Sequence, residues 1–161
     1  MNARKFILIK RSSIHRKEKT MSLISLVYAS LANENFSDDQ LKALLKKARE
    51  KNASLDITGM LLYRDGFFLQ VLEGEESQLD NLFKVISNDN RHRDALIIYK
   101  KSLKERVFSS WTMGFNKIED NDVASLEGYN VFLQTPTVEF FKGRETYVTA
   151  LLEQFKHNLL F

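Results

Sequence analysis

Residues 57–74 read ITGMLLYRDGFFLQVLEG, and this stretch decides the fold. It holds two apolar runs, 57–63 and 67–73, that are rich in residues favoured in β-strands. An Asp65-Gly66 pair lies between them, and Asp-Gly between two such runs is a strong short-range signal for a β-hairpin. We therefore predict two antiparallel strands joined by a tight turn.

A helix is predicted to precede this hairpin, beginning just after Ser37. Ser37 is a favourable N-cap, and Gln40 stands three residues later, so the two residues can form a capping box. Phe36 and Leu41 flank the cap as a hydrophobic staple. The apolar residues that follow recur with helical spacing and form one stripe, which comprises Leu41, Leu44, Leu45 and Ala48.

A second helix is predicted after the hairpin, with Ser77 as its N-cap and an apolar face made of Leu79, Leu82, Phe83 and Ile86. Three further strands are predicted at residues 23–29, 96–103 and 110–118. The order is β-α-β-β-α-β plus one strand, which is the ferredoxin-like pattern. The predicted fold class is therefore α+β, with the two helices on one face of the sheet.

Two polar side chains are predicted to meet on that face. In a ferredoxin-like sheet the first and third strands are central neighbours, and side chains alternate between the faces of a strand. Tyr28 shares a face with Ile24 and Leu26, and Gln70 shares a face with Phe68 and Leu72. A buried phenol or amide needs a partner, because leaving it unpaired costs roughly 1–3 kcal/mol.

The C-terminal segment is predicted to cover the opposite face, which is also apolar. A short helix is expected at about residues 122–127, and a long helix at about residues 138–158 carries a wide apolar stripe. The chain thus divides into a basic extension at residues 1–20, a core at residues 21–118 and a helical cap at residues 119–161.

Composition restricts the class of protein. The sequence has no cysteine, which excludes disulfides, thiolate metal sites and cysteine nucleophiles. Residues 1–20 carry seven Lys or Arg and one Glu, so the other residues carry 17 basic and 20 acidic groups. We expect the extension to be not native to the protein or disordered, with a membrane- or partner-binding arm as the alternative. The rest is mildly acidic, which argues against direct nucleic-acid binding. No apolar run approaches the ~20 residues of a membrane span, so we expect a cytoplasmic protein.

Three strings in order carry a resemblance to a known family: SLVYAS around Tyr28, FFLQVLEG around Gln70, and SSWTM around Trp111 and Met113. Each string places a polar or redox-capable side chain in a run that otherwise reads as buried strand. Over about residues 22–118 the chain resembles the BLUF family of blue-light sensors, which hold a flavin non-covalently. The resemblance implies a stand-alone photoreceptor that is not an enzyme.

The resemblance also implies roles for individual residues. Tyr28 matches the donor of an electron and a proton to the excited flavin, and Gln70 matches the switch glutamine that bridges the phenol and the ring. Asn52 matches an asparagine that pairs with the pyrimidine edge of the ring. Trp111 and Met113 match a pair on one face of the fifth strand, near the glutamine. A Trp-x-Met pair on a strand is ordinarily core, so their signalling role stays open.

The same resemblance implies a binding pocket for FAD, with FMN or riboflavin as alternatives. His92 is expected to bond a ribityl oxygen or a phosphate, and Lys84 and Val85 stand where many members carry a phosphate-binding arginine. Apolar contacts to the flavin are expected from Leu44, Ala48, Ile57, Phe68, Leu72 and Ile86. Positions near the ribityl and phosphate end are Lys47, Lys51, Asp89 and His92.

Two other functions remain open at this point. One is a flavin- or partner-binding module that does not respond to light. The other is a small ferredoxin-like enzyme, because this fold hosts several chemistries. A light sensor without an effector domain needs a downstream signalling protein, whose identity the sequence does not give. We also expect a homo-oligomer.

Overall fold

A computed structural model describes residues 21–123, 137–157 and 159 of the chain. The strands are β1 (Leu23–Ala32), β2 (Thr58–Arg64), β3 (Phe67–Glu75), β4 (His92–Ser102) and β5 (Gly114–Lys117). In this described part they form one sheet in the order β4-β1-β3-β2-β5. Neighbouring strands are antiparallel except β2 and β5, which are parallel. The predicted adjacency of the first and third strands is confirmed.

The hairpin between β2 and β3 has the predicted turn. Asp65 and Gly66 are its two loop residues, and both have positive φ values, of 44° and 87°. A two-residue turn with positive φ at both positions matches the twist of the strands that it joins, and glycine adopts this conformation without strain. Pairing continues along the hairpin from Arg64 and Phe67 to Thr58 and Glu73.

Helix α1 (Asp38–Ser54) begins as predicted, whereas α2 (Glu76–Ser87) does not. The capping box of Ser37 and Gln40 is present in full. The prediction of Ser77 as the second N-cap is wrong, because the N-cap is Glu75, whose carboxylate accepts a hydrogen bond from the Gln78 backbone N–H. A carboxylate there also meets the positive end of the helix dipole.

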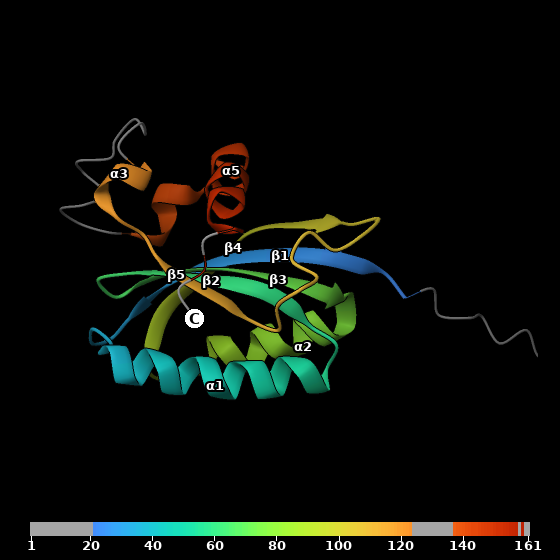
Figure 1. Cartoon of the computed structure of the whole chain (residues 1–161), viewed down its shortest axis with the longest axis horizontal. Coiled ribbons are helices and arrows are strands. Elements are labelled where there is room, and N and C mark those ends of the chain that lie inside the picture. Colours follow the sequence, from blue (N-terminus) through green and yellow to red (C-terminus); the bar gives the residue numbers. More distant parts are fainter. Residues whose placement is uncertain (1–20, 124–136, 158, 160–161) are drawn as a thin grey trace, which may run out of the picture.

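The sheet lies between two helical layers, which confirms the predicted architecture. Figure 1 shows α1 and α2 on one face, with α5 (Glu145–Phe155) on the other. Side chains alternate between the two faces along β1 and β3, so these strands contribute residues to the hydrophobic cores on both faces of the sheet. Ile24, Leu26 and Tyr28 pack with the α1 and α2 side, whereas Val27 and Ala29 pack with the C-terminal side.

The C-terminal layer corrects two predictions. The expected long helix at residues 138–158 is broken into a 3₁₀ turn η1 (Val138–Phe141) and α5. Gly143 lies between them with a φ of 75°, a left-handed conformation that a right-handed helix does not accommodate. The short helix begins earlier than predicted, as α3 (Asp120–Val123), and residues 124–127 lie outside the described part of the chain.

The fifth strand is shorter than predicted, so residues 110–113 form a loop before β5 rather than part of it. The backbone carbonyls of residues 112 and 113 accept side-chain hydrogen bonds from α1 rather than bonds from a neighbouring strand. Strands β1 and β4 are longer than predicted, and β4 begins at His92, which was expected in a loop.

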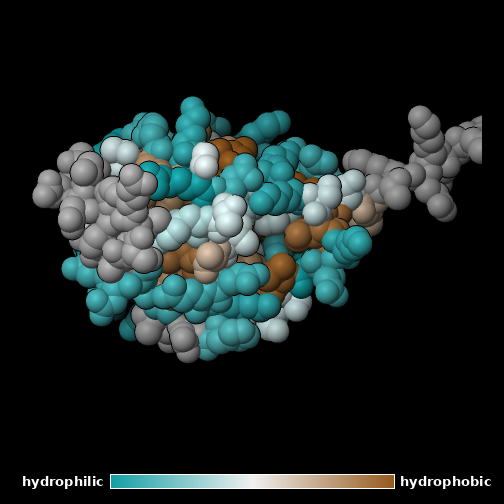
Figure 2. All heavy atoms as spheres, turned by 90° about the horizontal axis from the view of Figure 1, so that it is seen from above, coloured by the Kyte–Doolittle hydropathy of each residue, from teal (hydrophilic) through white to brown (hydrophobic). Residues whose placement is uncertain are grey.

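The surface on the α5 side is mixed. In the view of Figure 2, hydrophilic side chains predominate, and hydrophobic ones form small patches between them. Across the described residues, we find no helix with the length and apolar character to cross a bilayer. Residues 1–20 lie outside the described ranges, so the proposed basic extension and the division into core and cap stay predictions.

Candidate functional site

A cavity of about 310 Å³ lies between α1 and α2 and reaches the helix-covered face of the central strands. Its lining comes from strands β1, β2 and β3, the start of β4, helices α1 and α2, and the loops before α1 and after α2. It comprises Tyr28, Ser30, Phe36, Leu44, Lys47, Ala48, Lys51, Asn52, Leu61, Phe68, Gln70, Leu72, Leu82, Val85, Ile86, Asp89, Arg91 and His92. Apolar walls with a few polar groups are typical of a small-molecule site.

Every residue that we predicted to contact a cofactor lines this cavity except Ile57. Ile57 lies immediately before β2, is 1% exposed, and packs in the core beneath the site. Among the lining residues that the prediction missed are Ser30 and Leu82, although strand alternation from Tyr28 and the apolar stripe of α2 both indicate them. Arg91 was also missed, because it lies in a charged loop where no periodic pattern singles it out.

Tyr28, Gln70 and Met113 form a chain of polar contacts at the buried end of the cavity. Tyr28 and Gln70 are direct neighbours across β1 and β3, and the Tyr28 hydroxyl donates a hydrogen bond to Gln70 Oε1. Gln70 Nε2 in turn donates to Met113 Sδ at 3.2 Å. Tyr28 and Gln70 are 4% and 6% exposed, so this contact is shielded from solvent.

The environment of Tyr28 keeps its phenol protonated. Burial raises the pKa of Tyr28 above the usual value for tyrosine, and the negative charge of Asp89 adds to that rise. The ring packs edge-on against Phe83 of α2, with centroids 5.3 Å apart. Tyr28 is therefore a neutral hydrogen-bond donor near neutral pH.

Asn52 is nearly the last residue of α1 and is 2% exposed. Its Nδ2 donates to the Thr112 backbone carbonyl at 2.8 Å. A carboxamide has two N–H donors and one acceptor oxygen, so this bond leaves a donor and an acceptor for a ligand in the cavity. Asn52 therefore links the cavity to the loop before β5.

Trp111 and Met113 do not share a strand face, which corrects the prediction. Both precede β5, and they lie in different layers. Met113 is 1% exposed and packs in the core on the α1 and α2 side. Trp111 is half-buried and packs against the core on the C-terminal side. Two residues of one short loop thus contact opposite layers of the protein.

Charged residues gather at the exposed side of the cavity. Lys47, Lys51 and Arg91 line it from α1 and from the loop after α2. Arg91 Nε donates to Asp89 Oδ1 at 2.9 Å, and the bonds from Arg91 lower the pKa of Asp89 to about 2. This combination of cations and one carboxylate suits the phosphates and hydroxyls of a ligand.

His92 lines the cavity, but both of its ring nitrogens have protein partners. Nδ1 lies 2.9 Å from Ser30 Oγ, and Nε2 contacts the Ile86 backbone carbonyl. Because a carbonyl only accepts, Nε2 carries the hydrogen. His92 thus ties β4 to β1 and α2 in this structure, in contrast to the ligand bond that we expected from it.

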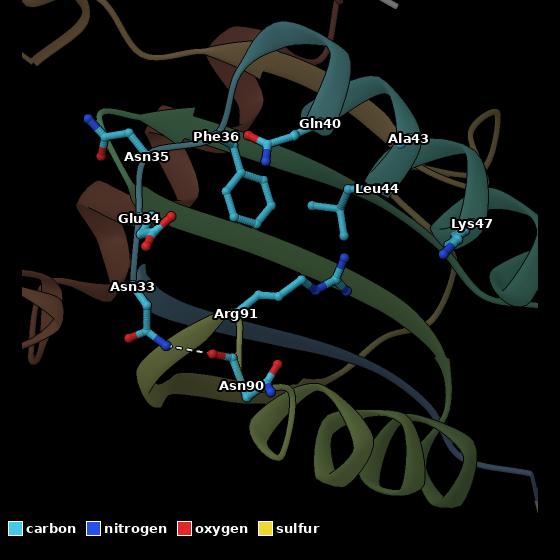
Figure 3. Close-up of a pocket in the computed structure, with 10 residues that line it drawn as sticks. All are labelled: Asn33, Glu34, Asn35, Phe36, Gln40, Ala43, Leu44, Lys47, Asn90 and Arg91. Atoms are coloured by element: carbon cyan, nitrogen blue, oxygen red, sulfur yellow. Dashed lines mark hydrogen bonds between the residues drawn. The ribbon is translucent and has the colours of Figure 1, made fainter.

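A second hollow of about 380 Å³ adjoins the first and shares Phe36, Leu44, Lys47 and Arg91 with it. Figure 3 shows the Phe36 ring pointing into this hollow and the Arg91 side chain extending across it toward Leu44. Its far side is polar, and the Asn33 amide there donates to the Asn90 backbone carbonyl at 2.6 Å. The two hollows therefore lie side by side, and the second is lined by neither Tyr28 nor Gln70.

These features define a class of protein: an α+β domain with a cavity between two helices and a sheet, whose lining includes a buried phenol and two buried carboxamides. The sequence model of the family described as "Sensors of blue-light using FAD" (BLUF) matches residues 23–114, which is more than half of the chain. The chain belongs to this family. The family's domain is a sensor module.

Individual proteins agree with this assignment. Photoactivated adenylate cyclase subunit beta of Euglena longa is 38% identical over 93 residues, which cover 57% of this chain and 11% of that protein. The chain thus corresponds to a small part of that relative. The photo-activated state of BlsA matches with a TM-score of 0.66 at 28% identity, over 83% of this chain and 94% of that one. Klebsiella pneumoniae BlrP1 with FMN and cyclic diGMP gives a TM-score of 0.56 at 29% identity, over 79% and 34%.

Proposed function

We propose that this protein is a blue-light photoreceptor that holds FAD non-covalently between α1 and α2 and is not itself an enzyme. The observation that carries the proposal is the Tyr28–Gln70–Met113 chain at the buried end of the cavity. A tyrosine and a glutamine bonded in this way, and open to a cavity, form a device that can move a proton and then change its hydrogen bonds.

The residues of the cavity fit a flavin. Aliphatic side chains of α1, α2 and β3 form walls for a flat apolar ring, and Asn52 and Gln70 offer donors and acceptors to its polar edge. Lys47 and Arg91 are exposed cations of the lining and would hold the phosphates. The second hollow, which shares both residues, would receive the adenosine end of FAD. Because the chain has no cysteine, we expect no thioether link to the cofactor.

A bound flavin would supply absorption of blue light and an acceptor for one electron and one proton. Tyr28 would give up both, because oxidation makes a phenol strongly acidic and Gln70 Oε1 already accepts from its hydroxyl. The Gln70 carboxamide would then rotate or tautomerise, which would exchange the donor and the acceptor that it presents to its neighbours. A stronger hydrogen bond from Gln70 to the flavin would account for a modest red shift.

Reconstitution with FAD tests the proposal. The purified protein should bind about one flavin per chain, release all of it on acid denaturation, and show a reversible red shift under blue light. A protein that remains colourless with excess FAD contradicts the proposed function. A protein that binds flavin without any reversible shift is instead the light-independent binding module.

The cations at the exposed end of the cavity should contribute to the affinity for phosphate. Replacing Lys47 and Arg91 together by Gln should weaken FAD binding roughly tenfold, because each charge-assisted hydrogen bond contributes about 1.5–3 kcal/mol and part of this is offset by solvent. Riboflavin has no phosphate, so its affinity should change less than about twofold. The matched control is Lys46→Gln, because Lys46 is an exposed cation of α1 that lines neither hollow. Equal weakening of both flavins would assign these cations a general structural role.

We infer that the signal leaves through the C-terminal layer to a partner protein. Support comes from the loop before β5, where Met113 contacts Gln70 and Trp111 packs against the C-terminal core. A rearrangement of Gln70 that moves Met113 also moves the backbone that carries Trp111. The identity of the partner and the formation of a homo-oligomer stay predictions.

A further inference from the structure

The loop before β5 is held by three consecutive backbone carbonyls. The carbonyl of residue 111 accepts from Gly59 N at 3.0 Å. The carbonyl of residue 112 accepts from Asn52 Nδ2 at 2.8 Å, and that of residue 113 accepts from Arg49 Nε at 2.8 Å. Two of these donors are side chains of α1, and we call the three bonds the carbonyl clamp.

Gly59 provides a rigid end for this clamp. A Cβ atom at position 59 would lie 2.1 Å from the Val71 carbonyl oxygen, so the close approach of β2 and β3 requires glycine there. The donor of this bond, Gly59 N, therefore belongs to a tightly packed pair of strands. The two bonds from α1 use side chains, which can lengthen or break while both backbones stay in place.

Arg49 forms the bond of the clamp that ends on a photoactive residue. Its guanidinium is always charged, and a hydrogen bond from a charged donor is stronger than a neutral one. The bond ends on the carbonyl of Met113, whose Sδ accepts from Gln70 Nε2 at 3.2 Å. Arg49 lines neither hollow, so we expect it to act on a bound cofactor through Met113 and not by direct contact.

This arrangement favours one orientation of Gln70. A thioether sulfur is a weak acceptor and has no hydrogen to donate. When the Gln70 carboxamide turns its oxygen toward Met113, the contact becomes unfavourable and Met113 must move away. The Arg49 bond opposes that movement, because it holds the Met113 backbone in the position found here.

We propose that Arg49 is a positioning residue of the photoswitch: it holds Met113 against Gln70 and thereby sets how fast the illuminated state returns to the dark state. This inference rests on the proposed photoreceptor function. Arg49→Ala removes the bond that favours the dark position of Met113. The illuminated state of this variant should therefore last at least about threefold longer, at an unchanged flavin content.

Two variants control the lifetime measurement. Lys46→Ala removes a positive charge from the same helix at an exposed position that lines neither hollow, and its lifetime should stay within about twofold of the wild type. Arg49→Lys keeps the charge but loses the planar Nε donor, so an intermediate lifetime is expected. If the lifetime of Arg49→Ala equals that of the wild type, the inference is wrong.

An infrared measurement tests the inference in the unmodified protein. Methionine labelled with ¹³C at the backbone carbonyl should give a light-minus-dark band in the flavin-loaded wild type, as the Met113 carbonyl exchanges its hydrogen bond. Met60→Leu should retain the band, and Arg49→Ala should lose most of it. A wild type that shows a normal red shift but no labelled band overturns this inference alone. A wild type without a red shift overturns the proposed function as well.

Discussion

Tyr28 and Gln70 owe their contact to the register of two strands. They face each other across β1 and β3, and a slip of one residue would move either side chain to the opposite face. The ferredoxin-like strand order and strand alternation together predict their meeting, and the structure confirms it. The third member, Met113, lies in a loop, where no periodicity predicts its position. Only the resemblance to a family pointed to it.

The hydroxyl of Tyr28 should be necessary for the response to light. Tyr28→Phe removes the group that donates to Gln70 Oε1, so it should abolish the light-induced red shift while flavin binding persists. Because an acceptor is left buried and unpaired, the free energy of unfolding should fall by about 1–3 kcal/mol. Absorption spectra and urea unfolding measure the two effects. A normal red shift in this variant would exclude Tyr28 as the donor.

At the scale of elements, the connection from β4 to β5 is tied to the sheet by a buried carboxylate. Glu73 of β3 is 1% exposed and accepts backbone N–H bonds from Val107 at 3.1 Å and from Phe108 at 2.9 Å. Arg106 adds bonds to the Glu73 carbonyl and to Asp56. Residues 106–108 of this connection are therefore anchored to the sheet, and the loop that contains Met113 follows them.

The same carboxylate predicts a pH dependence. Burial raises the pKa of Glu73 above its ordinary value of 4.5, and this outweighs the backbone hydrogen bonds that lower it. Folded protein therefore retains a proton that unfolded chains lose, so this group stabilises the fold at low pH. Its contribution decreases as pH rises from about 4.5 through the folded pKa.

Glu73→Gln tests this linkage. The measurement is urea unfolding of both proteins at a fixed flavin concentration. As pH rises above about 4.5, the unfolding free energy of the wild type should fall relative to that of the variant. Parallel curves for the two proteins would contradict it. Nothing in the sequence indicated this role, because Glu73 occupies a position where strand alternation places apolar residues.

Elements with a local chemical signal were predictable, and those set by distant contacts were not. The Asp65-Gly66 turn and the capping box of α1 follow from short motifs, and both are present. The start of β5 depends on side chains of α1 that donate to carbonyls of the loop. Gly143 is a possible helix-breaking residue in the sequence, but the apolar stripe on both sides of it favoured the prediction of one continuous helix.

The whole molecule has two cores separated by one sheet, with the cavity in one layer and the C-terminal helices in the other. Trp111 and Met113 connect the layers through a short stretch of backbone. A local switch shifts a coupled equilibrium only by its differential free energy, typically about 1–3 kcal/mol. We therefore expect light to cause a small shift in how α5 packs on the sheet and not to unfold the helix.

Hydrogen exchange in dark and light measures this coupling. Amide protection should change in residues 107–118 and in α5, because both contact the loop or the core beneath it. The β2–β3 turn is the internal reference, because the loop bonds to Gly59 near the start of β2 and the turn follows the end of that strand. Changes confined to the residues that line the cavity would exclude the C-terminal layer as the route of the signal.

The most direct test of the central claim compares light-minus-dark absorption of the wild type and Gln70→Leu, both loaded with FAD. The leucine side chain would keep an apolar contact with the ring but offer no donor or acceptor, so flavin binding should persist. The account predicts a reversible red shift in the wild type and none in the variant. An equal red shift in both proteins would contradict it, because the hydrogen bonds of Gln70 would then play no part in sensing light.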